Sequence, residues 1–497
     1  MKRHARLAFT AALATLLTVG CTLGPNFKRP EVPAGGYAHS APAATSGRTM
    51  ISGGDVADDW YQLFRSDSLN QLVRTALANN PDLEAARHGL VAAQYELKAV
   101  SGSELPQLDL TGQIGRAHIN GSFLYSPVES FTATGNRFAL GPTLAYNLDA
   151  FGGTRRAVEA QRAATTTVRD QVLNTYVTLV DQTVITAFDY AATLAEIEVT
   201  QALVDELQAQ FELTQTLENA GKIIRSDTLL AQTQLENLRA TLPALQQQRD
   251  VYRNALAQLC GQPPDQFTMP PLSLRDFALP RELPLSLPSA LVRQRPDVLA
   301  AEDNLHQASA TIGVAKAARF PELSITGQYA QQTSDTKDFF TGAGGIWSFG
   351  VNATQPLFHG GTLAARQHEA EQRFQQSLAT YRSTVNGALV EVANALQALQ
   401  HDADNYAAHS TALGAARADS DLARDQFRAG KYTELQVLTA EQQYQQAALT
   451  QVQADVQRFT DTAALFRALG GGWWNAPRDP TVLAAAPAAK TPGEAHE

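Results

Sequence analysis

Cysteine, methionine and clustered basic residues are scarce in this chain of 497 residues, and each scarcity excludes a class of protein. The two cysteines, Cys21 and Cys260, stand in very different contexts, so a disulfide framework is excluded. Only three methionines occur, which leaves no path of thioether ligands for copper or silver ions. The 39 basic residues are outnumbered by 49 acidic ones and form no run, so we expect no nucleic-acid partner.

Catalytic and metal-binding motifs are also missing from the sequence. The triplet His359-Gly360-Gly361 has no accompanying G-x-S-x-G nucleophile elbow. His368-Glu369 lacks the second histidine of a zinc-binding helix. Cys260 follows an apolar helical segment, where a small buried role is expected rather than redox chemistry. We therefore predict that the chain is not an enzyme and that it holds no metal or cofactor apart from a covalent lipid.

The lipid is predicted from the amino-terminal residues. Residues 1–20 form a secretory signal peptide, in which a basic start precedes an apolar run shorter than the ~20 residues of a membrane-spanning helix. Leu17-Thr18-Val19-Gly20-Cys21 resembles a bacterial lipobox, although Thr18 departs from the usual leucine. This motif predicts acylation of Cys21, which would hold the chain in a membrane leaflet. The alternative is an ordinary signal peptide with an incidental cysteine.

The residue after the cysteine is Thr22 rather than Asp, and by resemblance to sorted lipoproteins this favours the outer membrane. The following stretch, residues 21–58, is rich in Gly, Pro, Ala and Ser and shows no helical or strand period. It predicts a lipidated, extended tether.

The remainder of the chain repeats its motifs in the same order, which indicates a tandem duplication. Motifs of the first half recur 215 positions later and, further along, about 208 positions later; one pair is Pro81-Asp82-Leu83 and Pro296-Asp297-Val298. We predict a first repeat at 59–265, a linker at 266–287, a second repeat at 288–472 and a carboxy-terminal tail at 473–497. Each repeat has the order helix, strand pair, long helix, helix.

The strand pairs, at about 105–149 and 320–358, alternate apolar and polar residues. Apolar side chains of the four strands include Leu108, Leu110, Ile114, Phe138, Leu140, Leu323, Ile325, Tyr329, Trp347 and Phe349. This alternation is typical of membrane-spanning β-strands, and a sheet packed on a soluble core is the alternative. Small barrels need ~8 strands to close, so four strands predict a barrel shared between copies of the chain.

Two segments predict helices of unusual length. From 154 to about 219 and from 362 to about 428 no proline occurs and glycine is isolated, and apolar residues of the second segment recur at steps of four and three. At 1.5 Å per residue, ~65 residues reach ~100 Å, which is long enough to span a periplasm. Turns at Gly221-Lys222 and Gly430-Lys431 are expected to fold each long helix back on a shorter one, about 227–261 and 433–470, at the tip of the body.

Six stretches in this order resemble the outer membrane efflux factor family, specifically its TolC-like, NodT-type lipoprotein branch of resistance-nodulation-division (RND) efflux systems. They are Gly24-Pro25-Asn26-Phe27-Lys28-Arg29-Pro30, Arg295-Pro296-Asp297-Val298, Ile312-Gly313-Val314-Ala315-Lys316-Ala317, Phe320-Pro321, Gln355-Pro356-Leu357-Phe358-His359-Gly360-Gly361 and Ala468-Leu469-Gly470-Gly471-Gly472-Trp473. The resemblance implies a mixed α and β fold, in which long helical hairpins form a periplasmic α-barrel and four strands per protomer contribute to a twelve-stranded β-barrel.

The resemblance also implies assembly, partners and location. It implies a homotrimer in the outer membrane with a large periplasmic portion, docked onto a periplasmic adaptor and an inner-membrane RND transporter. Such a duct would passively export drugs or other small molecules. Ducts for protein secretion or for metal efflux are alternatives, and a structural envelope lipoprotein without a pore is a more distant one.

Relatives in this family narrow the periplasmic mouth with an apolar ring and an acidic ring near the last turn. The apolar position matches Leu435, whereas Thr439 stands where Asp is common and Gln426 where Arg is expected. Charge at the mouth could instead come from Glu434, Asp227 and Arg225. Gly221, Lys222, Gly430 and Lys431 are the candidates for adaptor docking at the tip. The alternative is that these turns are solvated and have no gating role.

Overall fold

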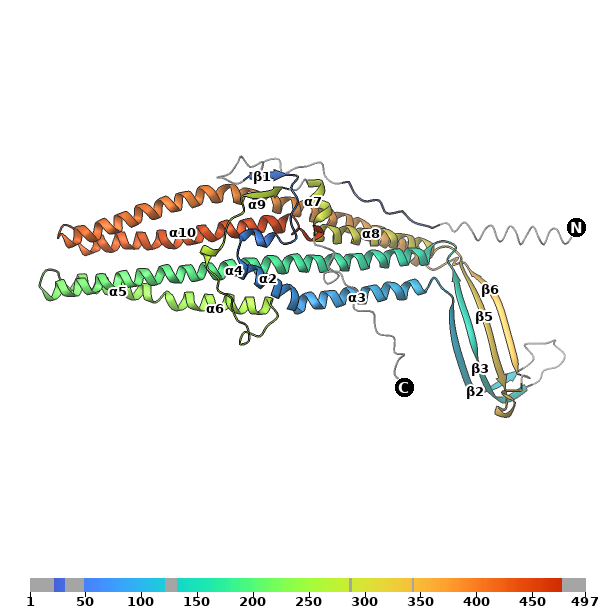
Figure 1. Ribbon diagram of the computed structural model, residues 1–497. Coiled ribbons are helices and arrows are strands. Elements are labelled where there is room, and N and C mark those ends of the chain that lie inside the picture. Colours follow the sequence, from blue (N-terminus) through green and yellow to red (C-terminus); the bar gives the residue numbers. More distant parts are fainter. Residues whose placement is uncertain (1–21, 32–48, 121–131, 286–287, 342–343, 476–497) are drawn as a thin grey trace, which may run out of the picture. The chain divides into compact units, whose positions relative to one another are not determined.

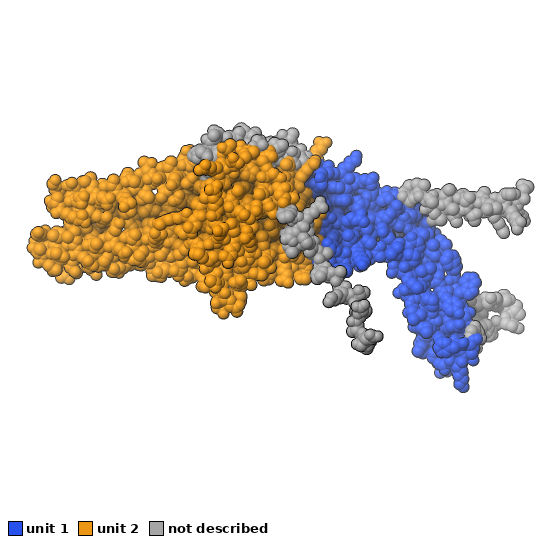
Figure 2. All heavy atoms as spheres, in the orientation of Figure 1, with its two compact units in different colours: residues 1–30, 91–168, 301–381 blue, residues 31–90, 169–300, 382–497 orange. Residues whose placement is uncertain are grey.

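The computed structural model describes residues 22–31, 49–120, 132–285, 288–341 and 344–475 (Figure 1). The signal peptide, Cys21 and most of the carboxy-terminal tail lie outside these residues. Within them, the chain divides into two compact units (Figure 2). Unit 1 comprises 1–30, 91–168 and 301–381, and unit 2 comprises 31–90, 169–300 and 382–497. Each unit therefore draws segments from both predicted repeats.

Unit 1 contains a four-stranded antiparallel sheet in the order β2-β3-β5-β6. The strands are β2 (Gln107–Asn120), β3 (Thr132–Leu148), β5 (Glu322–Thr333) and β6 (Gly345–Thr354), and the short helix η4 (Thr336–Asp338) lies between β5 and β6. All four predicted strands are confirmed. In the described part of the chain, β2 and β6 each pair on one side only, so the sheet has two open edges.

The register of this sheet gathers the predicted apolar residues on one face. Leu108 lies opposite Leu144, Ile114 opposite Phe138, Ile325 opposite Val351 and Tyr329 opposite Trp347. Directly opposed residues of antiparallel strands point to the same side of a sheet. The alternation read from the sequence therefore produces one apolar face and one face of Gln, Thr, Ser and Asn.

The two long helices are α4 (Gly153–Asn219) and α9 (Thr362–Arg428), each of 67 residues, and they confirm the prediction. The last helix, α10 (Glu434–Ala468), also matches its expected span. The corresponding helix of the first repeat differs, because it is divided into α5 (Arg225–Arg239) and α6 (Leu242–Leu259). Pro243 lies in the first turn of α6, where its missing amide hydrogen is tolerated, but it cannot continue the α5 hydrogen bonds.

Shorter helices complete the two units. They are η1 (Trp60–Phe64), α2 (Asp67–Asn79), α3 (Pro81–Gly102), η3 (Leu274–Asp276), α7 (Pro288–Gln294), α8 (Pro296–Ala317) and η5 (Trp473–Asn475). In unit 2, η1 contributes Trp60 and Phe64 to an aromatic core, where Trp60 stacks on Phe466 at 5.1 Å and Phe64 meets Phe188 edge-on at 4.9 Å. No helix in the described ranges is both long and apolar enough to cross a membrane.

The predicted tether differs from expectation in its described parts. Residues 22–30 lie against other segments of unit 1 rather than standing free, through contacts such as the hydrogen bond from Leu23 N to Phe151 O. Further on, β1 (Thr49–Ser52) forms a parallel pair with β4 (Glu282–Leu285) from the predicted linker. Neither β1 nor β4 shows an alternation of apolar and polar residues in the sequence, because a four-residue strand with a single partner needs little alternation.

Candidate functional site

The outward face of the β2-β3-β5-β6 sheet exposes large apolar side chains. Ile114 is 83 % exposed, Trp347 78 % and Phe349 67 %. A single chain therefore leaves a contiguous apolar surface uncovered, which soluble proteins avoid. On the opposite face, polar side chains bond across the strands, as in the contacts from Asn352 to Thr326 and from Arg137 to Gln332. The sheet has the character of a barrel wall with lipid on one side and water on the other.

The two helix turns of unit 2 share one geometry. Gly221 and Gly430 adopt left-handed backbone conformations, with φ of +68° and +72°. In each turn the next residue, Lys222 or Lys431, donates its amide to a carbonyl five residues earlier. This pattern is a Schellman helix ending, which requires a residue without a Cβ strain penalty at the glycine position. Both lysines are exposed at the turns.

Leu435 and Thr439 lie together on an exposed face of α10. They line an open groove with Asp419, Tyr432 and Gln443. Leu435 is 62 % exposed, and the Thr439 hydroxyl donates to the Leu435 carbonyl at 2.7 Å. The Thr439 side chain is therefore bonded to its own helix and places no charge in this groove.

Glu434 lies on the opposite side of α10 from this groove. Its side chain is buried, and both carboxylate oxygens accept from the Gln210 amide of α4, at 2.9 and 3.2 Å. Burial raises the pKa of Glu434 to about 7; the Gln210 hydrogen bond opposes this shift, while the charges of Glu441 and Asp227 add to it. Asp227 is partly buried in the first turn of α5, and Arg225 is exposed beside it. The structure thus brings Glu434 and Asp227 together and separates both from the Leu435 face.

An ion cluster that the sequence did not predict joins three helices near these residues. Arg424 of α9 donates to Glu441 of α10 at 2.9 Å and to Glu206 of α4 at 2.6 Å. Burial raises the pKa of the Glu441 carboxyl, and the hydrogen bond from Arg424 opposes that rise. Arg424 stands two residues before Gln426, the position where an arginine was expected. No local pattern reveals the cluster, because its members are far apart in the sequence.

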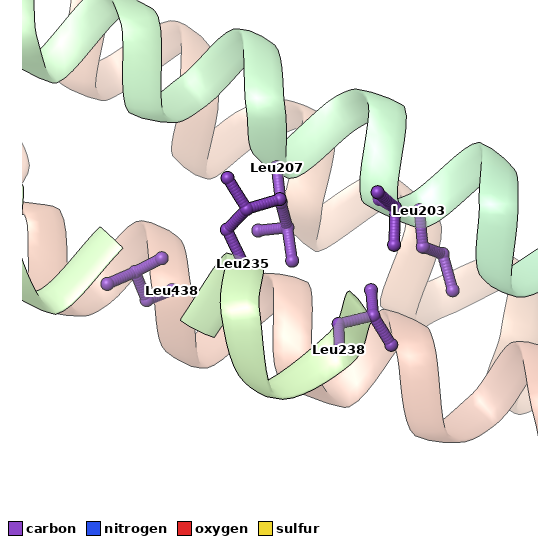
Figure 3. Packing of buried hydrophobic residues seen from close by; sticks show 6 residues of the cluster. Leu203, Leu207, Leu235, Leu238 and Leu438 are labelled. Carbon is purple, nitrogen blue, oxygen red and sulfur yellow. The ribbon is translucent and has the colours of Figure 1, made fainter. Parts of the chain in front are cut away.

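Leucine side chains surround this ion cluster and hold the two helical hairpins together. Figure 3 shows Leu203 and Leu207 of α4, Leu235 and Leu238 of α5 and Leu438 of α10 packed in one group. A second group joins Phe427 of α9 and Val437 of α10 with Leu213 and Leu217 of α4. Glu434 and Glu441 flank Leu438 on α10, so the carboxylates are buried where the hairpins meet.

The described residues contain no group of His, Cys, Asp and Glu side chains that could hold a metal ion. Cys260 is fully buried, and burial raises the pKa of its thiol to about 11, so it is held as the neutral, unreactive form.

Comparison with known proteins identifies the architecture. The family described as outer membrane efflux protein matches residues 72–262 and 287–471, once for each repeat and together over most of the chain. The chain belongs to the outer membrane efflux protein family. Its fold is that of the family's channels, with long periplasmic helical hairpins and four strands of a shared β-barrel, and its place is the outer membrane. It acts as the outer-membrane channel of an efflux system.

Individual relatives of this efflux channel cover nearly its whole length. The cation efflux system protein CusC of Escherichia coli K12 is 27 % identical over 473 residues, which are 94 % of this chain and 99 % of CusC. The toluene efflux pump outer membrane protein TtgC of Pseudomonas putida is 27 % identical and covers 93 % of this chain and 95 % of TtgC. The solved structure of the outer-membrane channel OprN superimposes with a TM-score of 0.83 at 28 % identity, over 91 % of this chain and all of OprN.

Proposed function

We propose that three copies of this efflux channel complete one β-barrel and one helical tunnel, which carry small organic molecules out of the periplasm. Energy comes from an inner-membrane transporter of the RND class, reached through a periplasmic adaptor. The channel itself is passive. Family membership supports this general assignment, while the specific partners and the cargo are inferences from the residues of this chain.

The proposal rests on the exposed apolar face and the two unpaired edges of the sheet. Its apolar face is exposed, and strands β2 and β6 are each paired on one side only in the described chain. Unpaired strand edges cannot remain in lipid, because each unsatisfied backbone group there costs several kcal/mol. Pairing of β6 of one copy with β2 of the next satisfies both edges, and three copies bring the strand number to twelve.

The periplasmic mouth is the proposed place of control. Leu435 and Thr439 supply its exposed inner surface, and the Arg424 cluster supplies the contact that keeps the two hairpins of one copy together. This arrangement assigns the restraining charges to the hairpin interface, where Glu434 and Glu441 are buried. The Leu435 face carries the neutral Thr439 and one exposed carboxylate, Asp419. The turns at Gly221-Lys222 and Gly430-Lys431 are the proposed docking points for the adaptor.

Lipidation of Cys21 is the proposed means of anchoring before the barrel closes. Cys21 lies outside the described residues, so this step rests on the lipobox resemblance and on the leader that precedes it. Mass spectrometry of the purified chain tests it directly, since the acylated cysteine adds the mass of its lipid to the mature amino terminus.

The cargo is proposed to be organic rather than metallic. Among the relatives, TtgC is named for toluene and CusC for cations. Outside the leader this chain has only Met50 and Met269, of which Met50 lies in β1 and Met269 in the loop after α6. Soft metal ions prefer thioether and thiolate ligands, and the sheet and long helices supply neither. Metal efflux remains the second candidate because CusC is among the relatives.

Three measurements test the proposal. The purified chain in planar lipid bilayers should conduct ions, and it should migrate as a trimer in detergent. Deleting its gene together with redundant channels should sensitise cells to organic toxicants and leave their tolerance of copper and silver unchanged. A stable monomer without conductance would overturn the proposal that the chain forms a channel. If the deletion cells became sensitive to metals alone, the cargo would be metal ions rather than organic molecules.

A further inference from the structure

The apolar face of the β2-β3-β5-β6 sheet ends in two basic residues, at the end of the strands remote from their connections to the helices. On β2, Ile114 is followed at alternate positions by Arg116 and His118. The pairing of β2 with β3 continues without a bulge along the whole of β2, so Arg116 and His118 point to the same side as Ile114. Both side chains are exposed. A basic pair therefore lies beyond the apolar residues on the face assigned to lipid.

Strand β3 places neutral hydrogen-bonding groups beside this basic pair. Arg116 lies opposite Asn136, and His118 lies opposite Thr134. The His118 ring nitrogen Nδ1 and the Thr134 hydroxyl oxygen are hydrogen-bonded at 2.5 Å. Among the contacts of the described residues, this bond leaves the Nε2 atom of His118 available to a ligand. The four side chains together form a polar patch on the outward face.

Charge is otherwise missing from this face of the described strands. Arg116 is the one permanently charged residue on it, because Asp109, Arg137 and Glu322 alternate onto the opposite face. There, Arg137 donates to Gln332 at 2.9 Å. Within the described part of the chain, no side chain accepts a hydrogen bond from the Arg116 guanidinium. An arginine that faces lipid is strongly destabilising at the bilayer centre and is tolerated near the headgroups, so we place Arg116 at the headgroup level.

The position of Arg116 along its strand agrees with this level. Nine residues separate Arg116 from Gln107, where β2 begins. At about 3.4 Å per residue they extend about 30 Å along the strand, and a tilt of roughly 40° reduces this to about 23 Å along the membrane normal. The apolar band of outer-membrane barrels is about 25 Å tall. Since the helices lie in the periplasm, Arg116 stands at the outer-leaflet boundary.

The duplication offers an internal comparison for this patch. With the offset of 215, Arg116 and His118 correspond to Gln331 and Thr333 of β5. The Gln331 amide donates to the Tyr329 hydroxyl on its own strand at 3.1 Å. The equivalent place in the second repeat is therefore neutral and bonded within the protein. The basic pair is specific to one of the two repeats and does not follow from the strand pattern that both share.

We propose that Arg116 and His118 bind a phosphate group of lipid A, the phosphorylated glycolipid of the outer leaflet. A guanidinium presents a planar fork of N–H donors that fits phosphate oxygens, and such charge-assisted bonds are stronger than neutral ones. The level of Arg116 selects the glycolipid, because phospholipids occupy the inner leaflet of this membrane. The inference rests on the proposed closure of the barrel in lipid, and each copy of the chain then carries one such site.

Native mass spectrometry of the purified full-length channel tests the site, with lipid A that carries two phosphates as the probe. We expect Arg116→Gln to reduce the retained lipid A about tenfold or more, because it removes the charged donors. Arg116→Lys keeps the charge but loses the fork and should lie between the two. Arg137→Gln is the matched control, since Arg137 pairs with Gly115 and lies on the opposite face. Equal retention by Arg116→Gln and the unchanged channel would overturn the site.

Further probes separate the possible sources of the phosphate. Lipid A without its phosphates should be retained by the unchanged channel as weakly as complete lipid A is by Arg116→Gln. Retention of phosphatidylglycerol that depends equally on Arg116, or displacement of lipid A by free inorganic phosphate, would overturn the glycolipid assignment. Conductance in planar bilayers is measured on the same preparations. A conducting trimer whose lipid retention ignores Arg116 contradicts only the lipid site, whereas a non-conducting monomer contradicts the proposed channel and the site with it.

Discussion

Glu434 is a buried carboxylate with two acidic neighbours, Glu441 of α10 and Asp227 of α5, whose charges raise its pKa. Arg424 bonds to Glu441 and to Glu206 of α4. Burial raises the Glu434 pKa from 4.5 to about 7, so between these values the folded chain binds more protons than the unfolded chain. The protonated Glu434 therefore makes its full contribution to the stability of the fold below pH 4.5, and this contribution is lost as the pH rises towards 7.

Glu434→Gln should therefore stabilise the helical hairpins at pH 8 and change little at pH 4.5. The amide keeps a hydrogen bond to Gln210 and removes the buried charge, which we expect to add on the order of 1 kcal/mol at pH 8. Thermal unfolding followed by circular dichroism at both pH values measures the effect. Glu96→Gln changes an exposed carboxylate and serves as the control. An equal effect of Glu434→Gln at both pH values would contradict the raised pKa of the buried Glu434 carboxyl.

Arg424 is the residue whose loss should loosen the mouth. Arg424→Gln leaves Glu441 buried without its counter-ion, which typically costs about 3 kcal/mol and weakens the contact between hairpins. We expect a larger single-channel conductance in planar bilayers, and Glu441→Gln in the same chain should restore the original value. Arg428→Gln removes an exposed arginine that pairs with Asp425 on its own helix and should have little effect. An unchanged conductance in Arg424→Gln would show that this ion cluster does not control the opening of the periplasmic mouth.

At the scale of the elements, much of the architecture could be predicted from the sequence. Long helices follow from the lack of proline and from apolar steps of four and three, and strands follow from strict alternation. The break between α5 and α6 was missed because the helical pattern continues on both sides of Pro243. The β1–β4 pair was missed because four residues carry too little periodicity. The Arg424 cluster was missed because ion pairs between distant helices leave no local signal.

The helix turns provide a prediction at this scale. Gly430→Ala should destabilise the tip by about 1 kcal/mol, because alanine is strained at φ of +72° although no atom obstructs its Cβ. Hydrogen exchange of the last turn of α9 and the first turn of α10 measures local opening. Gly387→Ala, in the interior of α9, should slightly increase protection instead. Identical behaviour of both variants would show that the turn geometry is not limiting.

At the scale of the whole molecule, the two faces of the sheet should respond differently to charge. Phe349→Arg places a guanidinium on the apolar face, which costs about 2–4 kcal/mol near the centre of a bilayer and should reduce insertion. Ser348→Arg adds the same group on the opposite face, where it should leave insertion intact and alter ion selectivity. Outer-membrane fractionation and reversal potentials measure the two outcomes. Loss of insertion in both variants would contradict the assignment of the faces.

The division of the last helix of the first repeat into α5 and α6, in contrast to the continuous α10 of the second repeat, has a consequence for symmetry. The three copies of the proposed channel would contribute six related helical hairpins, which resemble a hexagon when these differences are ignored. Only alternate hairpins contain the break, so the proposed ring has threefold rather than sixfold symmetry.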